Sequence, residues 1–113
     1  MKGTVENMDD MKFNKIIERS IAIRQSYHKL EKQFHKSEWT VEEDALAFLT
    51  DAGLVGRLAM SQQGRWPKGD NTVPELEHKL SECIWWIIVL AERMDIDIEK
   101  SLAEFLTKLE RQL

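Results

Sequence analysis

The sequence has little of several features that mark particular classes of protein. Cys83 is the single cysteine in 113 residues, so no disulfide can form within the chain, and we expect a reducing, cytoplasmic setting. No run of Lys and Arg occurs and the net charge is −4, which counts against a module that binds DNA or RNA. The first residues lack the apolar core of a signal peptide, so we expect no secretory leader.

Long apolar runs are also missing. The longest comprises nine residues, from Cys83 to Ala91, about half of the ~20 residues that a membrane-spanning helix needs. We therefore interpret this run as part of a buried helix and expect no membrane partner. The chain also has no Gly-rich phosphate loop, no internal repeat and no Ser/His/Asp or Cys/His pattern typical of a nucleophile.

What the chain does contain is apolar residues at helical spacing, with no strand-like alternation. The pattern predicts four helices, over about 11–36, 41–60, 73–94 and 98–112, with a loop at 61–72. The first ten residues are polar, and we expect a flexible N-terminus over 1–10. Residues 11–113 should then form a single domain, an all-α four-helix bundle.

Polar residues at the expected helix starts support these boundaries. Thr40 with Glu43, and Thr72 with Glu75, have the spacing of a capping box, and Asp97 can cap the last helix. In the first helix the apolar residues form one face, while Lys, Arg, Glu and His occupy the other, so His28 and His35 are expected on a solvated surface. The apolar face comprises Phe13, Ile16, Ile17, Ile21, Tyr27, Leu30 and Phe34.

Self-association is expected from the third helix. It is apolar nearly all round between Cys83 and Ala91, and such a helix must be covered on every side. We expect that three other short helices do not suffice and that a second copy covers the remaining face; a well-wrapped monomer is the alternative. Gly53 and Gly56 each disfavour the second helix by up to ~1 kcal/mol relative to Ala, which suggests a close approach to its backbone.

Carboxylates on the second and third helices are candidate metal ligands. Asp44 and Asp51 are seven residues apart on one helical face, and Glu75 and Glu82 share a stripe with Lys79. Facing carboxylates from two helices would suit magnesium. For Asp44 and Glu75 a solvated or capping role is the simpler interpretation. Asp51 lies mid-helix and Glu82 borders the apolar run, where a partly buried carboxylate needs a partner.

Two segments resemble a known family. They read WTVEEDALAFLTDAGLVGRLAM and HKLSECIWWIIVLAERMDIDIEKSL, and together cover about residues 39–105. They are similar to the MazG-like family of all-α nucleoside triphosphate pyrophosphohydrolases. The resemblance implies protomers that form dimers or tetramers, and hydrolysis of a nucleoside triphosphate to monophosphate and pyrophosphate. It also implies Mg²⁺ held by acidic residues on two helices.

The family's acidic motifs are only partly kept. The pattern E-E-x-x-E falls on Thr50, Asp51 and Leu54, and E-x-x-D falls on Lys79 and Glu82. Only Asp51 and Glu82 therefore keep a carboxylate. If the helices pack as in the family, Lys79 should lie near both, and its ammonium should replace the ion.

Two functions remain open at this point. One is a magnesium-dependent pyrophosphohydrolase with an altered site, in which Asp51 and Glu82 bind the metal, joined by Asp44 or Glu75. The other is a non-catalytic homo-oligomer that binds nucleotides or proteins, with no metal cofactor. In the 61–72 loop, a basic pair and an aromatic residue could contact a nucleotide, although an exposed loop of mixed charge is the simpler interpretation. These loop residues are Arg65, Trp66 and Lys68.

Overall fold

Four helices and no strands make up the part of the chain that the structure, a computed structural model, describes, residues 12–113. The helices are α2 (Phe13–His35), α3 (Val41–Gln62), α4 (Val73–Arg93) and α5 (Ile98–Gln112). The all-α prediction is confirmed, and the predicted boundaries agree to within a few residues. The expected flexible segment 1–10 lies outside the described residues. None of the described helices is long and apolar enough to cross a membrane.

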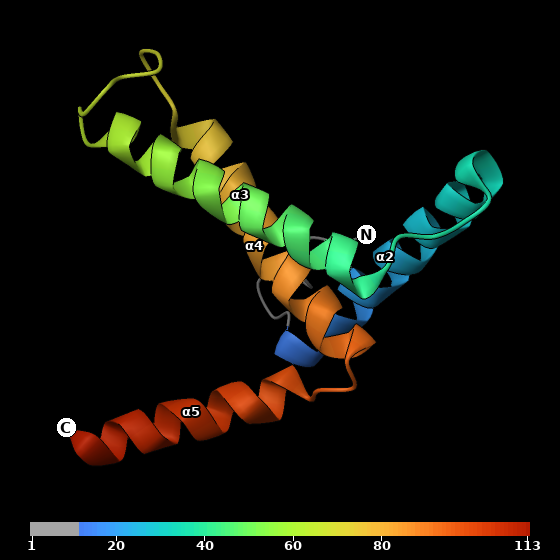
Figure 1. Cartoon of the computed structure of the whole chain (residues 1–113). Coiled ribbons are helices and arrows are strands. Elements are labelled where there is room, and N and C mark those ends of the chain that lie inside the picture. The colour runs from blue at the N-terminus through green and yellow to red at the C-terminus, as the bar shows by residue number, and fades with distance from the viewer. Residues whose placement is uncertain (1–11) are drawn as a thin grey trace, which may run out of the picture.

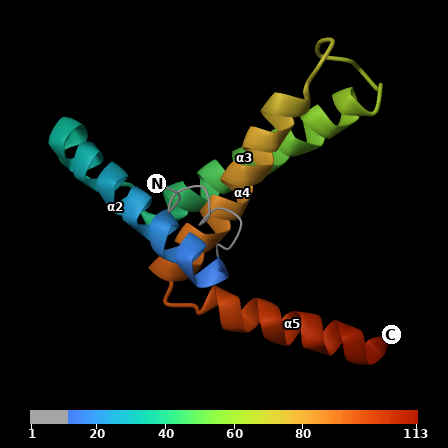
Figure 2. The ribbon, with the colours of Figure 1, turned by 180° about the vertical axis from the view of Figure 1, so that it is seen from behind.

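The helices form an open bundle built around α4. Helices α3 and α4 lie side by side and antiparallel, joined by the loop at one end (Figure 1). Helix α2 packs on α4, where the indole N–H of Trp85 donates to the backbone oxygen of Ser20 at 3.2 Å. Helix α5 meets the end of α4 and then extends away from the other helices (Figures 1 and 2).

Two of the three predicted helix caps are present. The Thr40 hydroxyl accepts the N–H of Glu43 at 3.1 Å, and the Glu43 carboxylate accepts the N–H of Thr40 at 2.8 Å. Asp97 accepts the N–H of Lys100 at 3.0 Å. The predicted capping box at Thr72 is wrong, because the Thr72 hydroxyl donates instead to the side-chain oxygen of Gln62 at 3.1 Å and ties the ends of α3 and α4 together.

The face of α2 that packs inward differs from the predicted one. Ser20 and Arg24 are buried, whereas several of the apolar residues are at least one-third exposed. The side chain of His28 is largely covered rather than solvated, and His35 is exposed as expected. The packing face of α2 is determined by an ion pair rather than by the apolar pattern, because Arg24 of α2 pairs with the buried carboxylate of Asp44 on α3. The exposed apolar residues are Ile16, Tyr27, Leu30 and Phe34.

The apolar core is small and centred on α4. It comprises Leu58 of α3 with Trp86, Ile88, Val89 and Ala91 of α4. The other described helices leave Leu80, Ile84 and Ile87 of α4 exposed, and the covering of this face by a second copy stays a prediction. The close approach expected at the two α3 glycines is not made within the described chain, where nothing lies within 4 Å of a Cβ added to either.

Candidate functional site

An ammonium group lies between two carboxylates where α3 packs on α4. The Lys79 Nζ is 3.1 Å from the Asp51 Oδ1 and 2.8 Å from the Glu82 Oε1. Asp51 comes from the middle of α3, whereas Lys79 and Glu82 lie three residues apart on one face of α4. The predictions that Asp51 and Glu82 approach each other across two helices, and that Lys79 contacts both, are confirmed.

The second oxygen of Asp51 is also engaged. The indole N–H of Trp86 donates to the Asp51 Oδ2 at 3.0 Å, and both residues are buried. Asp51 therefore has a fixed orientation and a partner for each oxygen, as a buried carboxylate requires. Trp86 was not among the site residues predicted from the sequence. The signal was its spacing, because residue 86 follows Lys79 by seven positions and Glu82 by four, and so shares their face of α4.

Glu82 is the more accessible carboxylate of the pair. Its Oε1 lies 3.3 Å from the His78 Nε2 as well as near Lys79, and its side chain is partly exposed. The hydrogen bond to Glu82, followed by that to Asp51, raises the pKa of Lys79 above its ordinary value of 10.5. Lys79 is therefore a permanent cation at neutral pH, and the three groups together carry a net charge of −1.

The neighbouring thiol has no sign of activation. Burial, followed by the charges of Asp51 and Glu82, raises the pKa of Cys83 above its ordinary value of 9.0. Because a thiolate rather than a thiol is the nucleophile, Cys83 is held in its unreactive form. This environment suits a small packing residue, and Cys83 is partly buried on α4.

The donor set at Lys79 does not fit a magnesium ion as it is arranged. Magnesium requires near-octahedral oxygen ligands at about 2.1 Å. Both oxygens of Asp51 already accept hydrogen bonds, and the Glu82 Oε1 faces an ammonium. Within residues 12–113, no group of three or more His, Cys, Asp or Glu is placed to hold a metal. An ion at this position would have to displace Lys79.

Asp44, the weaker metal candidate on α3, belongs to a separate cluster. Its side chain is 0% exposed, and its Oδ1 lies 2.7 Å from the Arg24 Nη2 of α2. Its Oδ2 lies 2.9 Å from the Arg93 Nη1 of α4. The prediction of a solvated or capping carboxylate is wrong for Asp44. Two arginines neutralise it, and these ion pairs join three helices.

The Arg24 side chain connects this cluster to its surroundings. Its Nη1 pairs with the Glu31 carboxylate at 2.8 Å, and its guanidinium lies over the rings of Trp39 and Trp86. Burial by itself would raise the pKa of Glu31, but hydrogen bonds from Arg24 and from the Trp39 N–H prevail and lower it below 4.5. Because Trp86 also holds Asp51, the buried cluster supports the position of the Lys79 site.

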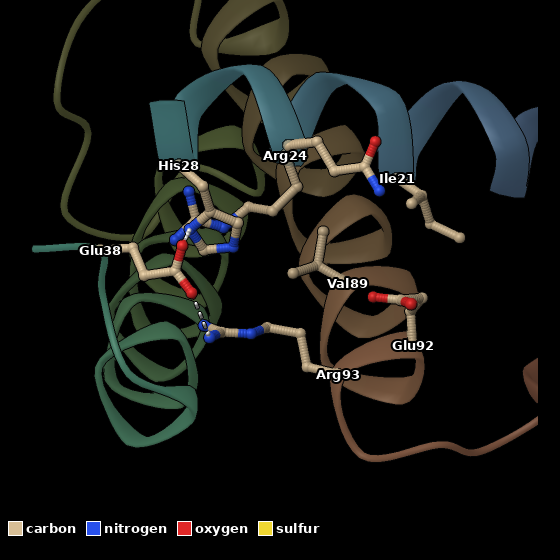
Figure 3. A pocket seen from close by; sticks show the side chains of 8 residues that line it. Ile21, Arg24, His28, Glu38, Val89, Glu92 and Arg93 are labelled. Atoms are coloured by element: carbon tan, nitrogen blue, oxygen red, sulfur yellow. Dashed lines mark ion pairs between the residues drawn. The ribbon is translucent and has the colours of Figure 1, made fainter. Parts of the chain in front are cut away.

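A pocket of about 320 Å³ lies beside this cluster, between α2 and the end of α4 (Figure 3). Its cations, Arg24 and Arg93, are already paired with carboxylates. Glu38, which also lines the pocket, lies 3.9 Å from Arg93 and 3.8 Å from His28 (Figure 3). The pocket therefore presents no unpaired basic group to an anionic ligand.

The remaining predicted residues lie at the loop end of the hairpin (Figure 1). Glu75 pairs with Lys68 at 3.5 Å, and both are exposed. The Trp66 side chain is exposed as well, at 76%. In the described part of the chain, no hydrogen bond or ion pair joins Arg65, Trp66, Lys68 or Glu75 to the Lys79 site. Their roles in binding a nucleotide or a metal stay predictions.

Comparison with known proteins does not identify a family for the chain. No protein-family model, curated protein or solved structure matches it. The resemblance to the MazG-like family is therefore carried by the two sequence segments and by their acidic motifs.

Proposed function

We propose that the protein is a MazG-like helical protein in which Lys79 takes the place of the metal ion. In this proposal it acts as a non-catalytic, self-associating interaction module. The observation that supports it is the Lys79 ammonium within hydrogen-bonding distance of both Asp51 and Glu82. These are the only two motif positions of the MazG-like pattern that keep a carboxylate.

Electrostatics at the site disfavours both parts of a metal–nucleotide substrate. A divalent cation would be repelled by Lys79 and would compete with it for the same oxygens. A triphosphate without its metal would meet a net negative charge, because two carboxylates face one ammonium. Catalysis of phosphoryl transfer depends mainly on positioning and charge stabilisation, and this arrangement supplies neither for a polyphosphate.

Exposed apolar surface supports the self-association. The chain exposes 8914 Å², whereas a compact monomer of 13.2 kDa exposes about 6,400 Å². On α4, the exposed Leu80, Ile84 and Ile87 occupy one side of the helix that the sequence predicts a second copy to cover. A dimer or tetramer would remove such residues from water.

A magnesium-dependent pyrophosphohydrolase is the second candidate. It is favoured by the meeting of Asp51 and Glu82 across two helices, as the family resemblance implies. However, the additional ligands considered for this function are engaged elsewhere. Asp44 is neutralised by Arg24 and Arg93, and Glu75 pairs with Lys68.

Release of pyrophosphate from a panel of nucleoside triphosphates, with Mg²⁺ or Mn²⁺, tests the proposal. We expect no release above the rate of the Asp51→Asn variant, with an active pyrophosphohydrolase assayed alongside. Metal-dependent release by the unmodified protein that Asp51→Asn or Glu82→Gln abolishes would establish the second candidate instead.

A further inference from the structure

Helix α5 has an apolar face that the described chain leaves uncovered. No residue of α5 is buried, and its four central large apolar side chains are 41–55% exposed. They recur at helical spacing, while charged residues occupy the other side of the helix. The helix projects from the end of α4 in both views (Figures 1 and 2). The four side chains are Leu102, Phe105, Leu106 and Leu109.

The outer side of α3 carries a matching apolar stripe, which we call the α3 seam. Its members are spaced alternately by three and four residues, as in helices that pack along their length. Asp51 and Leu58, which are buried toward α4, lie on the opposite side of α3. The three large members of the seam are exposed, and its two glycines face open space. The α3 seam consists of Leu46, Leu49, Gly53, Gly56 and Met60.

The two surfaces match in length and in shape. At 1.5 Å per residue, the 15-residue α5 is about 22 Å long, and the seam from Leu46 to Met60 is about 21 Å long. Phe105 is near the middle of α5, and Gly53 is at the middle of the seam. A large side chain therefore meets a residue without a side chain whether the two helices run parallel or antiparallel.

We infer, on the basis of the self-association proposed above, that α5 of one copy packs along the α3 seam of a second copy. The direction of α5 supports a second copy, because α5 diverges from the α3–α4 hairpin and does not lie along α3 of its own chain (Figures 1 and 2). The accessible area of the whole chain, 8914 Å², exceeds that of a compact monomer by about 2,500 Å², and a stable complex needs about 800 Å² from each partner. A twofold axis makes the exchange reciprocal, so that two α5 helices and two seams are covered together.

Cross-linking between variants tests this packing in the full-length chain. The native thiol is first removed by Cys83→Ala, and a Gly53→Cys chain is then mixed with a Phe105→Cys chain and oxidised. We expect a mixed disulfide dimer, at least about tenfold more abundant than in a control pair of Gly53→Cys with Arg111→Cys. Arg111 lies on the side of α5 opposite the centre of its apolar face.

Three results would overturn the inference. A monomer mass in light scattering would also remove the self-association of the proposed function. A dimer with no more disulfide than the control pair would leave that self-association standing and show that it uses another surface. A chain carrying both Gly53→Cys and Phe105→Cys that forms the disulfide at monomer mass would show that α5 folds back on its own seam.

A single substitution provides a second test that does not depend on cysteine. Gly53→Leu places a side chain where the described chain has open space, and it favours the helix, so the individual chain should fold at least as well. We expect its association to weaken by about tenfold or more, because the seam is then filled. The exposed Ala22→Leu on α2 is the matched control. Unchanged association in Gly53→Leu would contradict the packing.

Discussion

Two aspartates on one face of α3 show how their partners determine what each carboxylate can do. Asp44 and Asp51 are seven residues apart and both are buried against α4. Asp44 is bound by two arginines, whereas Asp51 is bound by one lysine and one indole. The first arrangement joins helices, and the second occupies the position where a metal would be expected from the family resemblance.

Loss of the Asp44 charge should be strongly destabilising. Asp44→Asn leaves Arg24 and Arg93 facing a neutral group in a buried site, which typically lowers the free energy of unfolding by about 3 kcal/mol or more. Urea unfolding measures the change, with the exposed Asp70→Asn as a control expected to stay within about 0.5 kcal/mol. Equal unfolding midpoints for the two variants would contradict the structural role of Asp44.

Acid should weaken the same cluster through Glu31. Its pKa is lowered below 4.5 in the folded chain, so the unfolded chain binds more protons in this range. The contribution of Glu31 is therefore complete above about pH 4.5 and is lost as the pH falls through the lowered pKa. Comparison of urea midpoints at pH 7 and pH 4 should show a smaller decrease for Glu31→Gln than for the unmodified protein. An identical decrease in both would exclude this contribution.

The sequence predicted the Lys79 site better than the Asp44 cluster, for a physical reason. The residues at Lys79 lie within motifs that resemble those of a family, and the resemblance implied that these motifs meet across two helices. Arg24 is a charged residue that follows Ile23 and precedes Gln25 on α2, and nothing local marks it as buried. Its burial depends on Asp44, twenty residues away, and long-range pairing of this kind is not visible in a helical pattern.

At the scale of the elements, periodicity located the helices but not the faces that pack. The α2 pattern placed Tyr27, Leu30 and Phe34 on the apolar face, and the structure leaves all three exposed. Helical spacing reports which residues share a side, whereas the choice of side depends on what the neighbouring helices supply. The same limit applies at Thr72. Its hydroxyl could cap α4 or bond to Gln62 of α3, and the sequence does not indicate which partner it takes.

Helix α5 should unfold locally without the rest of the chain. Asp97→Ala removes the cap of a helix that has no buried residue, which should destabilise α5 by about 1 kcal/mol. Hydrogen exchange should therefore accelerate in α5 and stay unchanged in α4 when the protein is dilute enough to be monomeric. The control is Thr40→Ala, which removes the cap of packed helix α3 and should lower global stability by a similar amount. If Asp97→Ala accelerated amide exchange less in α5 than in α4, the result would contradict this expectation.

At the scale of the whole molecule, the chain is more extended than a closed bundle. Its radius of gyration is 17.0 Å, whereas about 13 Å is typical of a compact domain of this length. The apolar composition of α4 indicated that one chain would leave part of this helix exposed, and Leu80, Ile84 and Ile87 are exposed. The faces of α5 and α3 could not be assigned from sequence, because amphipathic helices look alike whether they pack within a chain or between chains.

Stability should therefore depend on protein concentration. If folded copies associate, dilution shifts the equilibrium toward unfolded chains, and the melting temperature decreases. We expect this dependence to be weaker in Ile84→Gln, which replaces an exposed apolar residue of α4, than in the unmodified protein. Differential scanning calorimetry over a hundredfold range of concentration, about two decades, provides the measurement. A melting temperature independent of concentration would argue for a monomer.

The replacement of the metal by Lys79 is the central claim, and titration with Mg²⁺ by calorimetry tests it most directly. Three proteins are compared: the unmodified chain, Lys79→Glu, and Lys29→Glu, which makes the same charge change at an exposed position of α2. Lys79→Glu removes the ammonium and adds a carboxylate beside Asp51 and Glu82. Because the pKa of Lys79 is raised above 10.5, the lysine stays charged throughout a titration at neutral or mildly alkaline pH. We predict binding of Mg²⁺ by Lys79→Glu alone. Tight binding by the unmodified protein, or equal titrations for Lys79→Glu and Lys29→Glu, would contradict the account.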